Sequence, residues 1–182
     1  MSTPALKEWS AVVHALLGGR QTVLLRKGGI HEKRFEVAAG DFVLFPTVAH
    51  SHAQRVRPEH QDLLGPAETD STEAALTVRA AAKVVAAVAV TNIEGLTEIE
   101  DLHIWTPESV QADRVDFRPK HRLTVLVVSA RPLTDPVQLA RTPDFAGCKS
   151  WVDLPVAPTL GHPVHSDATL AEVAERVRHA VS

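Results

Sequence analysis

The stretch TPALKEWSAVVHALLGGRQTVLLRKGG, residues 3–29, decides how the fold begins. Thr3 can cap a helix, and Pro4 suits the first helical position. Apolar side chains then recur at helical spacing until a pair of glycines ends the pattern. We therefore expect a helix over residues 3–17. Residues 22–26 change to the pattern of a strand, which a second pair of glycines ends.

Strands and helices continue to alternate in the pattern downstream. We expect strands over residues 35–37, 42–45, 80–91, 122–131 and 149–154. Helical segments are expected at 50–64 and 96–102, from Pro107 with Thr106 as its cap, at 136–141, and from a cap at Ser166 or Asp167 to the C-terminus. The first strands should form a compact meander after the N-terminal helix. Together these elements predict an α+β fold in a single domain, residues 1–182.

Composition excludes several classes of protein. The 182 residues are 45% hydrophobic and 23% charged, which is typical of a globular chain. The net charge of −3 provides no general attraction for nucleic acid, so any nucleic-acid site has to be a local patch. The apolar stretch 84–93 is about half as long as a membrane span, and the N-terminus lacks a signal-peptide pattern. A single cysteine, Cys148, excludes an internal disulfide and favours the cytoplasm.

The ten histidines do not form a recognisable metal motif. They include His50, His52, His60, His103 and His121. The sequence contains no pair of histidines four apart around a glutamate and no cysteine pair. We therefore expect no metal and no other cofactor. Cys148 is interpreted as a small buried residue, and no serine lies in a nucleophile-elbow pattern.

The best local anion site is the end of the strand at residues 22–26. Arg26 and Lys27 precede Gly28 and Gly29, so two cations and free backbone N–H groups can meet a phosphate there. The alternative interpretation is a simple turn between two strands.

Two of the three tryptophans are candidates for stacking on a ring. Trp105 and Trp151 each lie beside polar residues, and an indole next to a loop can stack on a base. Packing in the core is the alternative for both. Trp9 falls among the apolar positions of the N-terminal segment and is expected in the core.

Four ordered strings resemble the bacterial domain-of-unknown-function family 1802. They are ALKEWSAVVHALLGGRQTVLLRKGGI (5–30), DFVLFPT (41–47), LHIWTPESV (102–110) and GCKSWVDL (147–154). The resemblance covers nearly the whole chain and brings no established activity with it.

A looser resemblance connects the chain with ASCH and EVE domains. GRQTVLLRKGG followed by AAGDFVLF resembles the opening of ASCH domains, and AKVVAAVAVTNIE with LTVLVVSARPLTDPVQL resembles the order of elements in EVE domains. The resemblance implies a PUA-like fold, in which an N-terminal helix, short helices and a C-terminal helix flank a small bent β-barrel.

This looser resemblance implies recognition of a single or modified base of RNA or DNA, or of a nucleoside-like small molecule. Trp105 and Trp151 would form the walls, and Arg26, Lys27, Gly28 and Gly29 the phosphate clamp. Thr47 and His50 would hydrogen-bond an edge of the base. Some ASCH proteins are amidohydrolases that use a lysine before the first strand and a threonine within it, and here Gln21 and Leu24 occupy those places. The resemblance therefore does not favour that activity, although Arg26 matches the family's arginine.

Three hypotheses remain open on the sequence alone. The first is a PUA-like module that binds nucleic acid or a modified base. The second is a hydrolase or nuclease acting on a nucleoside or nucleic acid, with His50, His103, Glu98 and Glu100 as candidate acids and bases. The third is a non-catalytic scaffold that docks a partner, or a second copy, on its C-terminal helix. The oligomeric state and the pathway stay open.

Overall fold

A computed structural model of the chain describes residues 2–28, 35–147 and 149–182. The strands are β1 (Thr3–Trp9), β2 (Val23–Lys27), β3 (Asp41–Thr47), β4 (Ala75–Ala89), β5 (Leu123–Ala140) and β6 (Trp151–Leu154). The α-helices are α1 (Ser10–Leu17), α2 (His52–Arg55), α3 (Leu64–Thr69), α4 (Pro107–Val110) and α5 (Asp167–Val181). The other helical segments are η1 (Pro58–Leu63), η2 (Ile93–Leu102), η3 (Gln111–Asp116) and η4 (Pro143–Phe145).

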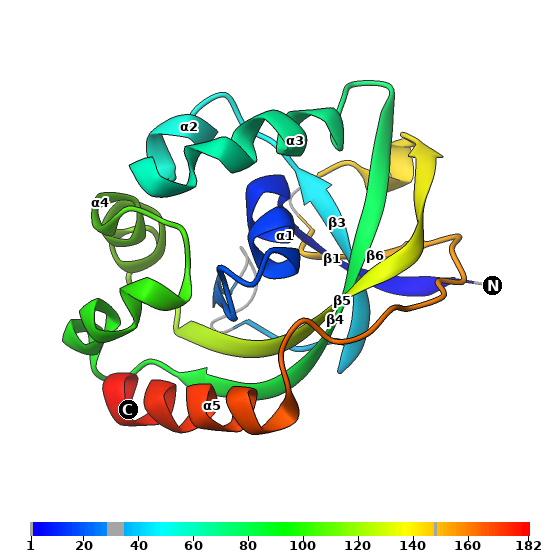
Figure 1. The fold of residues 1–182 in the computed structure, drawn as a ribbon. Helices are drawn as coiled ribbons and strands as arrows, with labels where there is room; N and C mark the ends of the chain where they lie inside the picture. The colour runs from blue at the N-terminus through cyan, green and yellow to red at the C-terminus, as the bar shows by residue number, and fades with distance from the viewer. Residues whose placement is uncertain (1, 29–34, 148) are drawn as a thin grey trace.

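The six strands form one mixed sheet in the order β2-β5-β4-β3-β1-β6. β1 and β3 are parallel, and every other neighbouring pair is antiparallel. The register of the long β4–β5 ladder shifts after Val78 and again after Val84, and such irregularities bend strands. Figure 1 shows both strands curving across the molecule. No ladder of the described residues joins β2 to β6, so the sheet is bent but stays open.

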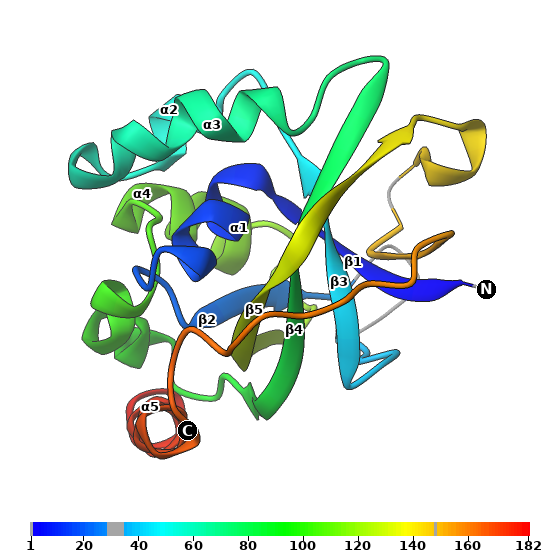
Figure 2. The same ribbon diagram turned by 45° about the vertical axis from the view of Figure 1, so that its right-hand side comes forward.

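The predicted α+β class is confirmed, with the bent sheet flanked by α1, by short helices and by α5. Figures 1 and 2 show α1 between the sheet and the row formed by α2, η1 and α3, while α5 lies at the other end of β4 and β5. The expected barrel is a looser match, because the outer strands of the sheet do not pair with each other.

Apolar side chains pack on both faces of this sheet. Ala5 and Leu6 are neighbours on β1 and both are fully buried, yet each belongs to a different cluster. The larger cluster includes Leu16 of α1 and Leu170 of α5. The smaller cluster lies at the end of the sheet near η4, where Phe45 meets Phe145 edge-on with ring centres 5.8 Å apart.

The helix predicted over residues 3–17 is wrong in its first half. Residues 3–9 form β1, which pairs with β3 on one side and with β6 on the other, and the helix begins only at Ser10. Both sets of partners are distant in the sequence, and their pairing overrides the local preference for a helix. The packing of Ala5 and Leu6 on opposite faces of the sheet fits a strand and not a helix.

Three further expectations about the strands are wrong. Residues 35–37 form no strand, and β2 pairs with β5 instead of forming a meander with β3. The strand expected to end at Arg131 continues to Ala140, so residues 136–141 do not form a helical turn. Pro132 pairs with Ala80 and the next pair is Val137 with Val78, so four residues bulge opposite one. Proline is tolerated at bulges because no ladder hydrogen bond is lost there.

Two of the three predicted helix caps are confirmed, whereas Thr3 lies in β1 and caps no helix. The Thr106 hydroxyl accepts a hydrogen bond from the Ser109 N–H at the start of α4, and Ser166 accepts one from Thr169 at the start of α5, each at 3.1 Å. Strand β4 includes most of the predicted 80–91 segment, and η2 includes 96–102. Within the described residues, none of the helices combines the length and the apolar character needed to cross a membrane.

Candidate functional site

Arg26, expected to bind a phosphate, is engaged inside the fold. Its Nη1 donates to the Lys7 carbonyl at 3.0 Å and to Glu8 Oε2 at 3.2 Å. The guanidinium also lies 5.0 Å from the centre of the Phe35 ring. Glu8 is buried, and its second oxygen accepts the Trp9 N–H at 2.9 Å. The pair therefore ties β2 to β1, because each charge satisfies the other in a poorly hydrated place.

Lys27 is likewise bound to the protein. Its ammonium donates to the carbonyls of Arg114 at 2.7 Å, Val115 at 3.2 Å and Phe117, and so fixes the end of η3 against β2. Burial lowers the pKa of Lys27. The carbonyl of Gly28 lies 3.2 Å from Nδ1 of His121, and Gly29 lies outside the described residues. The carbonyl groups that bind Lys27 come from almost 90 residues downstream, so no local sequence signal reveals them.

The tryptophan rings are covered by other side chains. Trp151 is stacked with Phe35 and meets Phe42 edge-on, with ring centres 6.1 and 5.1 Å apart, and its indole N–H donates to the Glu36 carbonyl at 3.0 Å. Trp105 is buried and contacts Trp9 edge-on at 5.3 Å. Both rings therefore pack within the fold, and the structure does not bring them together as facing walls.

Thr47 is the last residue of β3, and His50 lies three residues further along the chain. Thr47 pairs with Trp9 in the β1–β3 ladder. His50 is exposed and lines a pocket of about 310 Å³ together with His52 and Glu68. His52 is only 4% exposed, and neither of its ring nitrogens has a hydrogen-bond partner among the described residues. In the sequence, His52 is only one of the histidines that form no recognisable metal motif.

Burial, together with the nearby Arg55 guanidinium, lowers the pKa of His52 to about 4. The ring is held edge-on against Trp9 at 4.4 Å. Across the described part of the chain, no three or more His, Cys, Asp or Glu side chains are grouped so that they could hold a metal ion.

His103 and Glu100 line one pocket of about 430 Å³ between η2 and the α4–η3 segment, which we call the helical pocket. Glu98 does not line it. Glu98 is exposed, and its carbonyl accepts a hydrogen bond from Arg176 of α5. Of the four candidate acids and bases, the structure therefore brings only His103 and Glu100 together.

His103 is suited to donating a hydrogen bond rather than to accepting a proton. It is 1% exposed, and its Nδ1 accepts the backbone N–H of Trp105 at 3.1 Å. The ring proton therefore lies on Nε2. Burial, together with the Arg57 and Arg114 guanidinium groups, lowers the pKa of His103 to about 4. A neutral imidazole whose Nδ1 is already occupied has no free nitrogen with which to act as a base.

The positions that carry lysine and threonine in ASCH amidohydrolases have structural roles in this chain. The Gln21 side chain donates to the Val23 carbonyl at 2.8 Å and accepts the Ile104 N–H at 3.3 Å. Leu24 is buried in the larger core cluster. Neither position offers a reactive group to a ligand.

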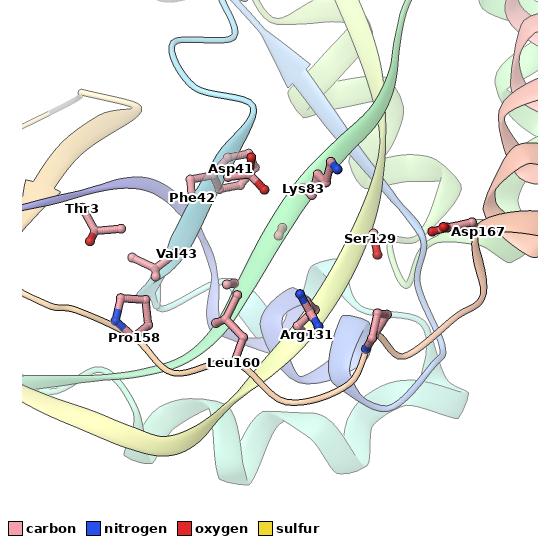
Figure 3. A pocket seen from close by; sticks show the side chains of 13 residues that line it. Thr3, Asp41, Phe42, Val43, Lys83, Ser129, Arg131, Pro158, Leu160 and Asp167 are labelled. Atoms are coloured by element: carbon pink, nitrogen blue, oxygen red, sulfur yellow. The ribbon is translucent and has the colours of Figure 1, made fainter.

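A third pocket lies beneath the segment 155–166, which runs from β6 to α5 and which we call the strap. Backbone hydrogen bonds from Gly161 to Pro132 at 2.8 Å and from Val164 to Ala130 at 2.9 Å attach the strap to β5. The strap pocket beneath it holds about 270 Å³ and is shown in Figure 3. One face of β3, β4 and β5 forms the floor of this pocket.

The alternation of side chains along these strands builds the floor of the strap pocket. Odd-numbered residues share one face, so apolar Val43 and Ala81 lie among polar Lys83, Ser129 and Arg131. The register places Lys83 between Asp41 on β3 and Ser129 on β5. Figure 3 shows the side chains of these strands facing Pro158 and Leu160 on the strap.

Two polar groups of the strap pocket have no partner among the described residues. Ser129 is only 8% exposed, and its hydroxyl makes no hydrogen bond to another described residue. The Lys83 ammonium is exposed and forms no ion pair with a described residue. Arg131 is partly engaged, because its Nε donates to the Gly161 carbonyl at 2.9 Å. None of these residues is among the predicted site residues, although the lysine within the apolar run AAAKVV is an available signal in the sequence.

Three solved structures of one protein are similar to this chain. The ASCH protein from Zymomonas mobilis has 13% identity and a TM-score of 0.43, over 98% of this chain and 95% of that chain. Its serine-to-alanine variant has 16% identity and a TM-score of 0.45, over 74% and 72% of the two chains. A tyrosine-to-phenylalanine variant has 18% identity and a TM-score of 0.44, over 74% and 73%.

Among the curated proteins, none matches this chain. One family model does match, over residues 5–176, and it describes a domain of unknown function (DUF1802). That match includes most of β1 and most of α5, with every element between them. The resemblance carried by the four strings is confirmed, and the chain belongs to the DUF1802 family.

Proposed function

We propose that the protein is a binding module for a nucleoside-like ligand, free or as one base of a single-stranded nucleic acid, and that the ligand occupies the strap pocket. The observation that carries the proposal is an apolar slot whose Lys83 and Ser129 have no partner among the described residues. Small-molecule sites typically combine apolar walls with a few such polar groups.

The chemistry of the slot suits a heterocyclic base. Its apolar residues, among them Val43, Ala81 and Pro158, can pack against the flat face of a ring. Asp41 and Asp167 can accept hydrogen bonds from ring or exocyclic N–H groups, while Lys83 and Arg131 can donate to ring nitrogens or carbonyls. A base presents both kinds of group along its edges, so it can use both signs of charge.

The dimensions and charge of the slot disfavour larger ligands. A volume of about 270 Å³ lies just below the range of sites for drug-sized molecules, so it suits one nucleoside rather than a duplex. The two cations and two carboxylates that line it cancel in formal charge. Binding should therefore depend only modestly on salt, in contrast to a site that contacts many phosphates.

The test is thermal unfolding with a panel of nucleosides, nucleotides and short single-stranded oligonucleotides. A ligand at about 100 times its dissociation constant stabilises by about 2.7 kcal/mol, which raises the Tm of a chain of this length by roughly 5–10 °C. Lys83→Met keeps the length of the side chain and removes its charge, so the shift should shrink. Lys120→Met is the matched control, because Lys120 is exposed and does not line the slot.

Two results would reject the proposal. One is a panel in which no nucleoside, nucleotide or oligonucleotide changes Tm. The other is a ligand whose shift is the same in Lys83→Met, in Lys120→Met and in the unmodified protein, because such a ligand binds elsewhere.

A further inference from the structure

The helical pocket differs in charge from the strap pocket. Carboxylates of Glu94 and Glu100 line it, neither forms an ion pair with a described residue, and no lysine or arginine lines it. These two carboxylates disfavour a phosphate beside them and favour a cation. Its apolar lining includes Leu96, Val110 and Ile93, the last of which is half exposed.

A buried donor at the same pocket gives an independent indication of a ligand. His103 lines the pocket while 99% of its surface is covered, as its 1% exposure implies. Its Nδ1 is occupied by the Trp105 N–H, and its Nε2 makes no hydrogen bond to another described residue. An N–H that lines a pocket without a protein partner can donate to a ligand, so a ligand that supplies an acceptor there gains a hydrogen bond.

The pocket therefore offers two negatively charged hydrogen-bond acceptors, one neutral hydrogen-bond donor and an apolar wall. A ligand that satisfies all three carries an ammonium group, a nearby carbonyl oxygen and an aliphatic side chain. A free α-amino group next to a carbonyl has this arrangement, whereas a simple amine lacks the acceptor and an acylated amine lacks the charge.

We propose that the helical pocket binds the unblocked α-amino group and first carbonyl of an amino-acid amide or a peptide N-terminus. The ammonium lies between Glu94 and Glu100, the carbonyl oxygen accepts the His103 Nε2–H, and an aliphatic side chain packs on Leu96 and Val110. This site is separate from the strap pocket and does not depend on a nucleoside binding there.

Calorimetric titration with three small probes tests the chemistry. L-Leucinamide carries all three features, N-acetyl-L-leucinamide lacks the positive charge, and isopentylamine lacks the carbonyl. Charged hydrogen bonds contribute about 1.5–3 kcal/mol, so removing the charge should weaken binding about tenfold or more. The tripeptide Leu-Gly-Gly distinguishes a peptide N-terminus from an amino-acid amide as the ligand. A site for a peptide N-terminus binds it at least as tightly as it binds L-leucinamide.

Matched variants locate the site. Glu100→Gln removes one carboxylate charge and should weaken L-leucinamide about tenfold, while Glu98→Gln, on the same helical segment but outside the pocket, should have no effect. His103→Asn retains an acceptor for the Trp105 N–H through its amide oxygen but lacks the ring Nε2. It should bind L-leucinamide more weakly and isopentylamine as before.

Three results would overturn the proposal. They are the absence of L-leucinamide binding, equally tight binding of the N-acetyl compound, and equal losses in Glu100→Gln and Glu98→Gln. The melting temperature of each variant, measured alongside, confirms that the variant is folded at the titration temperature.

Discussion

Replacing His52 with phenylalanine should stabilise the protein, although the residue is almost completely buried. Both ring nitrogens of His52 lack a hydrogen-bond partner among the described residues. A buried polar group without a partner costs about 1–3 kcal/mol. Phenylalanine has a ring of similar shape without those nitrogens, so it retains the edge contact with Trp9. After allowing for strain from the larger ring, we expect a gain of about 2 kcal/mol at pH 7.

The gain should increase in acid. Burial lowers the pKa of His52 to about 4, whereas the ordinary value for an unfolded chain is about 6.5. Between these two values the unfolded state binds the proton more readily, so protonation favours unfolding as the pH falls. The stability lost through this one group between pH 7 and pH 5 is about 2 kcal/mol. His52→Phe does not suffer that loss, so its advantage should approach about 4 kcal/mol at pH 5.

His103 provides the matched control. Its pKa is also lowered to about 4, but its Nδ1 accepts the Trp105 N–H. His103→Phe should therefore destabilise the protein at pH 7 by about 1–3 kcal/mol, because it leaves that N–H buried without an acceptor. Urea unfolding of both variants at pH 7 and pH 5, with unchanged denaturant slopes, measures the two effects. A His52→Phe variant that is no more stable than the unmodified protein at either pH would show that the buried ring nitrogens carry no such cost.

Two other substitutions test how the elements are held together. Asp70→Asn should lower the free energy of unfolding in urea by about 2–3 kcal/mol. The Asp70 carboxylate is 2% exposed and accepts hydrogen bonds from Arg79 at 2.5 and 2.7 Å, while the Arg79 side chain is 33% exposed. A change below about 0.5 kcal/mol would contradict this role. Gly95→Ala should cost about 3 kcal/mol or more, since an added Cβ would lie 1.6 Å from the Ala180 carbonyl oxygen of α5. Gly65→Ala is its control, because nothing lies within 4 Å of the added atom there. Equal melting temperatures for the two variants would contradict the expected loss of stability.

Patterns that depend on local sequence predicted the structure well. The caps at Thr106 and Ser166 act over three residues, and β4 follows from a run of alanines and valines bounded by turn residues. Local patterns failed at β1, where helical spacing and a proline near the start favoured a helix. Its partners lie in β3 and β6, and such distant pairing leaves no trace in a local window.

The candidate site was harder to predict for the same reason. Arg26 and Lys27 stand together in the sequence like a phosphate clamp, but Glu8 and three distant carbonyls bind them in the fold. His103 and Glu100 are three residues apart, and they do line one pocket. The strap pocket could not be inferred, because it exists only where residues 155–166 cross the sheet above Lys83 and Ser129.

The position of β1 inside the sheet has a consequence for how the chain folds during its synthesis. Its parallel partner β3 is complete once Thr47 is made, but its other edge stays unpaired until Leu154 is made. At ribosomal rates of about 5–20 residues per second, that edge is open for roughly 5–20 s. During this time the row of free backbone groups on β1 can pair with another nascent chain, so crowded polysomes and slow codons after residue 47 are the conditions under which misassembly should begin.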